Sequence, residues 1–178
     1  MSTPSRHPVA VVQGEIRISS DPEMLLSTIL GSCVAVCLHD PVSRTGGMNH
    51  FLLPFGQEEG ANRPVRYGIF AMEMLINALM KEGAKTSRMQ AKLFGGARIS
   101  TDLHDIGQSN ATFAREFLTT EGIQCLAESL GGSNARRVIY HPATGHARML
   151  LVPQTNLDDL RPRPPVARSP VDTGVELF

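Results

Sequence analysis

The chain has 178 residues, of which 42% are hydrophobic and 19% are charged, and its formal net charge is zero. This length and composition fit one globular domain with an ordinary core, and they exclude a disordered or fibrous chain. A neutral chain has no basic field to hold nucleic acid or an anionic lipid surface, so neither is expected as a main partner.

The composition also bears on the cellular compartment. The N-terminal segment MSTPSRHPVA lacks the apolar core of a signal peptide. No run in the sequence approaches the roughly 18 apolar residues of a membrane span. We therefore expect a cytoplasmic protein that does not insert into membranes. Three cysteines are an odd number, and a reducing compartment disfavours disulfides, so a free thiol is available as a reagent.

Three segments differ in composition. Residues 1–8 are polar, contain two prolines and are expected to be loose. Residues 9–153 carry the apolar periodicity of a folded domain. Residues 154–178 are rich in proline and charge with little periodicity, which predicts a mobile tail.

Short apolar or alternating runs in the first third of the chain predict strands. They cover residues 9–19, 25–30, 34–38 and 48–53. Gly14 is expected to form a bulge in the first strand. The third run is nearly continuous, which predicts a strand buried on both faces. A loop over residues 40–47 is expected to join the third and fourth strands.

The second part of the chain changes to helical periodicity over residues 67–81. An alternating strand over 89–93 is expected to end at Gly95-Gly96, and Asn110 is expected to cap a helix over 111–121. A strand and then a hairpin are predicted at 123–128, 136–141 and 146–152. Together these elements predict an α+β fold, with seven or eight mostly antiparallel strands and two main helices.

Cys33 is the candidate nucleophile of the chain. It follows Gly31-Ser32, where a strand emerges from a turn, and a glycine there permits unusual φ and close backbone approach. The backbone N–H groups of Gly31 and Ser32 are candidates for an oxyanion hole, which acyl-transfer chemistry needs. Cys37 and Cys125 lie inside strands with apolar neighbours, so both are predicted to be core residues.

His50 is the candidate base, because it would take the thiol proton and lower the pKa of Cys33. Ser27 or Thr28 would offer a hydroxyl to its other ring nitrogen. A simple hairpin centred near residue 43 instead sets His50 opposite Cys37, with Cys33 roughly 13 Å away along the strand. Spacing favours Cys37, whereas exposure and the glycine turn favour Cys33, and the sequence leaves both open.

A zinc site is the other chemical option, with Cys33, Cys37, His39 and His50 as ligands. The two cysteines are four residues apart on a strand rather than in a tight C-x-x-C knuckle, and His39 is expected to be solvated. The glycine pairs at 95–96 and 131–132 lack the spacing of a phosphate-binding loop. We therefore expect neither a metal nor an organic cofactor.

Several spaced motifs resemble one family. LGSCVAVCLHDP and GGMNHFLLP are followed by AKLFGGA at 91–97, GQSN at 107–110 and GGSNARRV at 131–138. Together they resemble the chemoreceptor glutamine deamidase family, CheD, over about residues 9–152. The resemblance implies an α/β sandwich related to the bacterial toxin deamidases. It also implies hydrolysis of particular glutamine side chains on methyl-accepting chemotaxis receptors to glutamate and ammonia.

The resemblance assigns the family's catalytic cysteine and histidine to Cys33 and His50. The family's threonine lies six residues before the cysteine, where this chain has Ser27, so the chain departs from the pattern there. Thr28 is the substitute after a local shift. Loops over 55–65 and 97–108 are the candidates for selecting a helical receptor surface.

The resemblance leaves a second function open. Some relatives bind a CheC-type phosphatase, which makes such a phosphatase a candidate partner. Because Ser27 departs from the family pattern, a non-catalytic module that binds the phosphatase or a receptor array is the alternative function. The same site chemistry would also support hydrolysis of methyl esters, a related acyl transfer.

Overall fold

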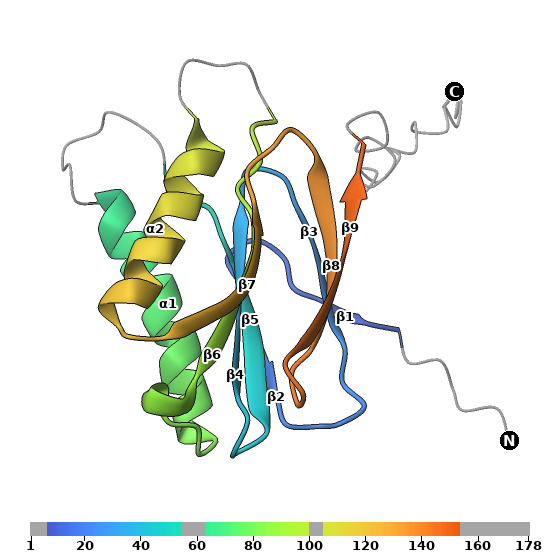
Figure 1. Ribbon diagram of the computed structural model, residues 1–178, viewed down its shortest axis with the longest axis vertical. Helices are drawn as coiled ribbons and strands as arrows, with labels where there is room; N and C mark the ends of the chain where they lie inside the picture. The colour runs from blue at the N-terminus through green and yellow to red at the C-terminus, as the bar shows by residue number, and fades with distance from the viewer. Residues whose placement is uncertain (1–6, 55–62, 100–104, 154–178) are drawn as a thin grey trace, which may run out of the picture.

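The computed structural model describes residues 7–54, 63–99 and 105–153, which form three layers (Figure 1). Two helices cover one face of a five-stranded sheet, and a four-stranded sheet covers its other face. Five of the seven strand pairs in the described part of the chain are antiparallel. The predicted α+β class with mostly antiparallel strands is therefore confirmed.

The five-stranded sheet has the order β2 (Ile16–Ser19), β5 (Thr45–Phe51), β4 (Val34–Asp40), β6 (Gln90–Gly95) and β7 (Gln124–Leu130). The four-stranded sheet has the order β1 (Val9–Ala10), β3 (Leu26–Leu30), β8 (Ala135–His141) and β9 (His146–Val152). The helices are α1 (Arg63–Lys81) and α2 (Ile106–Thr120), with a short 3-10 turn η1 (Thr86–Arg88) before β6.

The β4–β5 hairpin lies between two hydrophobic cores. Every residue of both strands is buried, as the continuous apolar run in β4 predicts. Val34 and Val36 face the helices, whereas Ala35 and Cys37 face the four-stranded sheet. Because a slip of one residue would exchange these faces, both cores specify the register of this hairpin.

The single strand predicted over residues 9–19 is wrong. Its first part, β1, pairs with β3 in the four-stranded sheet, and its second part, β2, pairs with β5 in the other sheet. Gly14 lies between them with a φ of 89°. A left-handed turn, which glycine adopts without steric cost, therefore carries the chain from one sheet to the other.

The turn of the β4–β5 hairpin is shorter than the predicted loop over 40–47. Asp40 pairs with Thr45, so four residues separate the strands. The Asp40 carboxylate accepts hydrogen bonds from the N–H groups of Val42 and Ser43 and is paired with Arg88. A buried carboxylate thus closes the turn, and this shortening changes which residues face each other farther along the hairpin.

The helix α2 begins at Ile106, earlier than the predicted start at residue 111. Its cap is Asp105, whose side chain accepts from the N–H of Gln108. Asn110 lies inside the helix and is fully buried, so the predicted capping role of Asn110 is wrong. The periodicity of α1 is confirmed, although that helix also begins a turn earlier than predicted.

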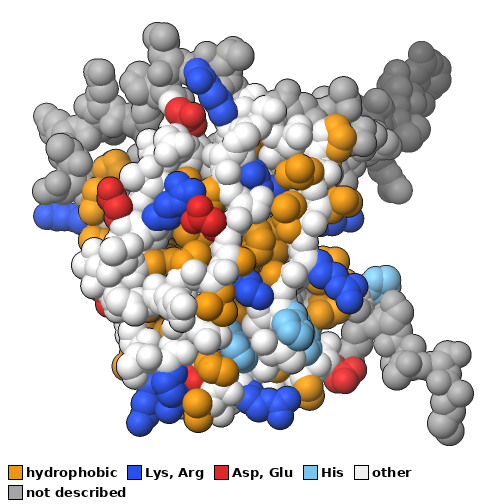
Figure 2. All heavy atoms as spheres, viewed as in Figure 1, with side chains coloured by type: hydrophobic (Ala, Val, Ile, Leu, Met, Phe, Trp, Pro, Cys, Tyr) orange, Lys and Arg blue, Asp and Glu red, His pale blue; other side chains and the backbone are white. Residues whose placement is uncertain are grey.

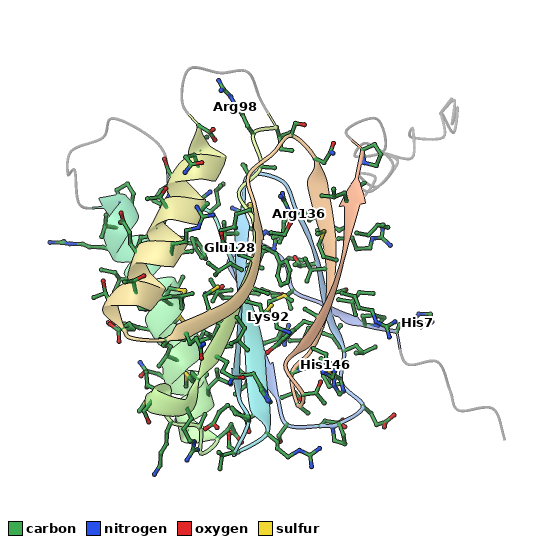
Figure 3. The ribbon with its side chains drawn as sticks, viewed as in Figure 1. His7, Lys92, Arg98, Glu128, Arg136 and His146 are labelled. Carbon is green, nitrogen blue, oxygen red and sulfur yellow. The ribbon has the colours of Figure 1, made fainter. Side chains whose placement is uncertain are left out.

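Two basic side chains link the sheets on the side shown in Figure 3. Arg136 of β8 donates to Ser129 Oγ and to the carbonyl of Gly131 at the end of β7. Lys92 of β6 donates to the carbonyl of Gly145 in the β8–β9 turn. These bonds hold the two sheets together at an edge where no strand continues from one to the other.

Several predicted segments lie outside the described residues. They are the tail over 154–178, residues 1–6 of the predicted loose N-terminus, and most of the predicted loop over 55–65. None of the helices in the described ranges combines the length and the apolarity that crossing a bilayer requires.

Candidate active site

Cys33 lies in a backbone turn that its neighbours hold at three consecutive carbonyls. The residue directly precedes β4 and is partly exposed. The bonds run from Ala97 N to Gly31 O (2.9 Å), from Asn110 Nδ2 to Ser32 O (2.8 Å) and from Gly96 N to Cys33 O (2.8 Å). Among the described residues, no carbonyl accepts from the N–H groups of Ser32 or Cys33. The turn is therefore fixed through its carbonyls while these two N–H groups stay available.

Glycines at the end of β6 and in α2 let the backbone pack closely around this turn. Gly95 has a φ of 113°, and a Cβ on it would lie 2.1 Å from the carbonyl oxygen of Cys33. Gly107 of α2 would place a Cβ 2.4 Å from the carbonyl oxygen of Ala97. Since real Cβ atoms are not tolerated at such distances, side chains here would push the supporting backbone away from Cys33.

Asn110 is a supporting residue whose role the sequence analysis missed. Its Nδ2 donates to Ser32 O, and its Oδ1 accepts from Leu53 N at 2.9 Å. One buried amide thus ties the turn before Cys33 to the chain leaving β5. The signal available in the sequence was an asparagine within a helical apolar stripe, since a buried polar side chain there must satisfy its bonds.

His50 is held on β5 by a hydrogen-bond arrangement that determines its tautomer. Its Nδ1 lies 2.9 Å from Thr28 Oγ1 and 3.1 Å from the carbonyl oxygen of Val11. The Thr28 hydroxyl itself donates to that carbonyl at 2.8 Å. A carbonyl oxygen only accepts, so Nδ1 carries the hydrogen. The other nitrogen, Nε2, therefore has its lone pair free.

The Nε2 atom of His50 is buried and has no hydrogen-bond partner among the described residues. Burial lowers the pKa of His50, an effect that the hydrogen bond from Nδ1 to the Val11 carbonyl partly opposes. The ring is therefore neutral at neutral pH, with an unoccupied acceptor. A neutral imidazole with this tautomer is the form that acts as a general base.

Three residues of the loop between β1 and β2 are hydrogen-bonded to His50. Besides the contact from Val11 to the ring, Gly14 N donates to the His50 carbonyl at 2.7 Å, and His50 N donates to Glu15 O at 3.1 Å. Val11 N is bonded in turn to Ser27 O at 2.8 Å. The orientation of the ring thus depends on a backbone loop that lies more than 30 residues away in the sequence.

The register of the hairpin corrects the predicted distance between Cys33 and His50. Ala35 lies opposite His50, and Cys37 lies opposite Met48, so the prediction that His50 faces Cys37 is wrong. Cys33 is two residues from Ala35 on the same side of the strand. Diagonal neighbours of this kind lie about 7–8 Å apart at Cα, rather than the roughly 13 Å expected from a longer turn.

The thiol of Cys33 donates to Gln13 Oε1 at 3.5 Å rather than to His50. Burial raises the pKa of Cys33 to about 11, although its own backbone N–H lowers it in part. The resting site therefore holds a neutral thiol and a neutral imidazole, and proton transfer between them requires the sulfur to turn from Gln13 towards Nε2.

Comparisons with known proteins identify the family. A model of the family described as CheD chemotactic sensory transduction matches residues 52–150. A protein of Caulobacter sp. (strain K31) is 48% identical over 173 residues, which is 96% of this chain and 92% of that protein. A protein of Sinorhizobium medicae (strain WSM419) is 46% identical over 177 residues, 96% of this chain and 95% of that protein. Both are named probable chemoreceptor glutamine deamidase CheD. The chain belongs to the CheD family.

A solved structure of low similarity was also found, that of the Bacillus licheniformis hypothetical protein YfiH. It is 17% identical with a TM-score of 0.43, and the match covers 64% of this chain and 49% of that one. The CheD resemblance expected from the spaced motifs is confirmed by the family match and by the curated relatives.

The two candidate hydroxyls of this CheD family member point to opposite faces of β3. Thr28 faces inwards between the sheets, is 5% exposed and contacts His50. Ser27 faces outwards and lines a pocket of about 460 Å³ together with Ile29 and Ile139. No hydrogen bond joins the Ser27 hydroxyl to another described side chain. Strand alternation therefore brings Thr28, rather than Ser27, to the imidazole.

The remaining cysteines and His39 lie away from this site. Cys37 is buried in the core, as predicted, but Cys125 is exposed because β7 is an edge strand with little cover. His39 is buried, with Nδ1 2.9 Å from the carbonyl of Pro142, so the prediction that it is solvated is wrong. Within the described ranges, no three His, Cys, Asp or Glu side chains gather closely enough to hold a metal ion.

Proposed function

We propose that this CheD family member hydrolyses the side-chain amide of particular glutamines on methyl-accepting chemotaxis receptors, giving glutamate and ammonia. The names of the curated relatives support the reaction and the substrate class. One structural observation carries the mechanism: Thr28 and the Val11 carbonyl hold His50 Nδ1, which leaves a buried Nε2 with no hydrogen-bond partner among the described residues.

In the proposed first half-reaction, His50 Nε2 takes the proton of the Cys33 thiol. The sulfur then forms a bond to the carboxamide carbon of the glutamine, and the C=O electron pair moves onto oxygen. The protonated His50 gives its proton to the nitrogen, the C–N bond breaks, and ammonia leaves. Because burial raises the thiol pKa, the resting thiol is protonated, and the attack needs His50 to remove that proton.

In the second half-reaction, water attacks the thioester carbon while neutral His50 Nε2 takes a proton from that water. The C–S bond then breaks, and the proton returns to the sulfur, which leaves glutamate and free Cys33. Thr28 acts in both halves as a positioning residue, because it keeps the hydrogen on Nδ1. Ser27, which corresponds to the family's threonine by spacing alone, lacks a contact of this kind.

The oxyanion of each tetrahedral intermediate needs donors that are already in place. The N–H groups of Ser32 and Cys33 fit this role, because the neighbouring carbonyls are held and no carbonyl of the described residues accepts from either donor. The Gly31 N–H is the other oxyanion donor that the sequence suggests. A fixed donor costs no reorganisation when charge develops on the oxygen, which is why such turns accelerate acyl transfer.

The experiment that tests this function is mass spectrometry of receptor peptides after incubation with the protein. Intact protein is expected to convert individual glutamines to glutamates and to release one ammonia for each. The Cys33→Ala variant is expected to give no conversion above the peptide-only control, whereas Cys37→Ala, matched in chemistry, keeps the activity. A normal rate in Cys33→Ala would contradict the mechanism.

One observation favours the alternative, a regulatory module that binds a chemotaxis phosphatase or a receptor array. The Cys33 thiol is hydrogen-bonded to Gln13 and its pKa is raised, so it is not poised as a thiolate. This alternative predicts that intact protein leaves receptor peptides unchanged and that binding of a CheC-type phosphatase survives Cys33→Ala.

A further inference from the structure

The side chain that contacts the Cys33 thiol is itself a glutamine. Gln13 Oε1 accepts from Cys33 Sγ at 3.5 Å, and no function in the reaction described above uses Gln13. Its carboxamide has the same group, on the same two-methylene stem, as the substrate of the proposed reaction. A resident carboxamide therefore lies where an incoming one must reach the sulfur.

The backbone around Gln13 is anchored on both sides. Val11 is buried and bonded to Ser27, and its carbonyl contacts His50 and Thr28. On the other side, Gly14 N is bonded to the carbonyl of His50 at 2.7 Å. Since these bonds fix the chain within two residues of Gln13, displacing its carboxamide requires only rotations of an exposed side chain and no movement of the loop.

Gln13 also lines the pocket of about 460 Å³ that reaches His50 and Thr28. Gln13 thus contacts the thiol and also lines the pocket that holds the base and its supporting hydroxyl. While Gln13 accepts the thiol hydrogen, that hydrogen is not shared with Nε2, which has no partner among the described residues.

We propose that Gln13 is a specificity-determining residue, whose carboxamide occupies the substrate's place at Cys33 and is displaced by the glutamine that is to be hydrolysed. This inference rests on the proposed deamidase function. A bound substrate displaces the carboxamide of Gln13 from the thiol, which then donates its hydrogen to His50 Nε2 instead. An unoccupied site keeps its thiol covered and protonated, which protects it from other electrophiles.

The first test needs no substrate and measures the rate at which iodoacetamide alkylates Cys33. It uses a Cys125→Ser background, because Cys125 is exposed and would react, whereas Cys37 is buried. Removing a hydrogen bond to the thiol in Gln13→Ala is expected to raise the alkylation rate of Cys33 about three- to tenfold. Val12→Ala is the matched control, because Val12 is an exposed neighbour on the same loop, and its truncation should leave the rate unchanged.

The second test measures steady-state deamidation of a receptor peptide. In Gln13→Ala the KM is expected to fall by about the same three- to tenfold factor, because substrate no longer displaces a resident group, while kcat stays within about twofold. In Gln13→Glu a carboxylate beside the sulfur is expected to slow alkylation below that of the unchanged chain.

Equal alkylation rates in Gln13→Ala and its parent would overturn the proposal. So would a loss of kcat at constant KM, which would assign Gln13 to the transition state instead. Conversion of Gln13 itself to glutamate, seen by peptide mapping and absent in Cys33→Ala, would make it a substrate and also overturn its role as a displaced occupant. If Gln13→Ala speeds alkylation but the intact chain deamidates no peptide, the hydrogen bond from Cys33 to Gln13 is supported. The proposed deamidase function then fails by itself.

Discussion

Two cysteine–histidine pairs lie on the same face of the β4–β5 hairpin, one near each end. Cys33 and His50 lie at the open end, and Cys37 and His39 lie near the turn. Both histidines are buried, at 7% and 8% exposure. Each also has Nδ1 beside a backbone carbonyl, that of Val11 at 3.1 Å or that of Pro142 at 2.9 Å. The residue types and the burial of the histidines therefore do not distinguish the two pairs.

The backbone around each cysteine does distinguish them. Cys37 lies within a regular ladder, paired with Met48 on one side and Lys92 on the other, and its pKa is raised more strongly than that of Cys33 because its burial is complete. Cys33 lies just outside the ladder, in a turn where no carbonyl of the described residues accepts from the N–H groups of Ser32 or Cys33. A nucleophilic cysteine must be accessible to substrate and must lie near N–H groups that can bind the oxyanion. A strand meets both conditions only where its backbone pairing ends.

Cys37 and His39, the pair near the turn, line a second pocket. His39 and Cys37 line a pocket of about 220 Å³ between the sheets, together with Lys92 and His146. On the face shown in Figure 2, apolar side chains gather over the space between β7 and the β8–β9 hairpin, with basic and histidine side chains at its lower end. Lys92 and His146, both labelled in Figure 3, line this pocket from β6 and β9. Burial raises the pKa of Cys37, which disfavours a thiolate in this pocket.

The largest expected effect separates the two histidines, since only His50 is proposed to act as the general base. His50→Gln is expected to lower kcat for receptor-peptide deamidation about 10²- to 10⁴-fold, because the general base is lost. His39→Gln is expected to keep kcat within about twofold, since its amide can replace the bond to the Pro142 carbonyl. Ammonia release under saturating peptide measures both, and a comparable loss in the two variants would contradict the assignment of His50.

A smaller effect separates the two hydroxyls on β3. Thr28→Val is expected to reduce kcat about three- to tenfold, because His50 loses one neutral hydrogen bond while the Val11 carbonyl still holds Nδ1. Thr28→Ser keeps the hydroxyl and should keep kcat close to that of the unchanged chain. Ser27→Ala, on the outer face, should leave kcat within about twofold. If Ser27→Ala caused the larger loss, the spacing expected from the family resemblance would be right and the contact in the structure would not support catalysis.

The smallest expected effect is in the pH dependence of kcat/KM and of Cys33 alkylation, which tests the burial of His50 and Cys33. Burial lowers the pKa of His50 below its ordinary value of 6.5, so the neutral base persists as pH falls through 6.5. We expect kcat/KM to hold its plateau there and to decline only at lower pH. On the alkaline side, alkylation of Cys33 in Cys125→Ser should keep rising towards pH 11, because the thiol pKa is about 11. A half-loss of kcat/KM at pH 6.5 would show that the ring is not desolvated as described.

Long periodic segments were predictable because their signals are local. The buried strand β4, the apolar stripe of α1 and the β8–β9 hairpin each repeat a pattern over several residues, and all three are confirmed. The spaced glycine motifs likewise predicted the family. Element ends were less predictable, since a single side chain such as Asp105 or Asp40 determines where α2 begins and where the hairpin turns.

The sequence alone determined the nature of the candidate site: a thiol after a glycine turn, an imidazole on the next strand and a hydroxyl on the one before. Only the tertiary structure decided which atoms meet. Thr28, Val11 and His50 belong to three strand or loop segments in two sheets, and their contact depends on the crossing at Gly14 and on the register of the hairpin. Hydrogen bonds between such distant residues leave no periodic trace in the chain, because they arise from sheet packing rather than from neighbouring residues.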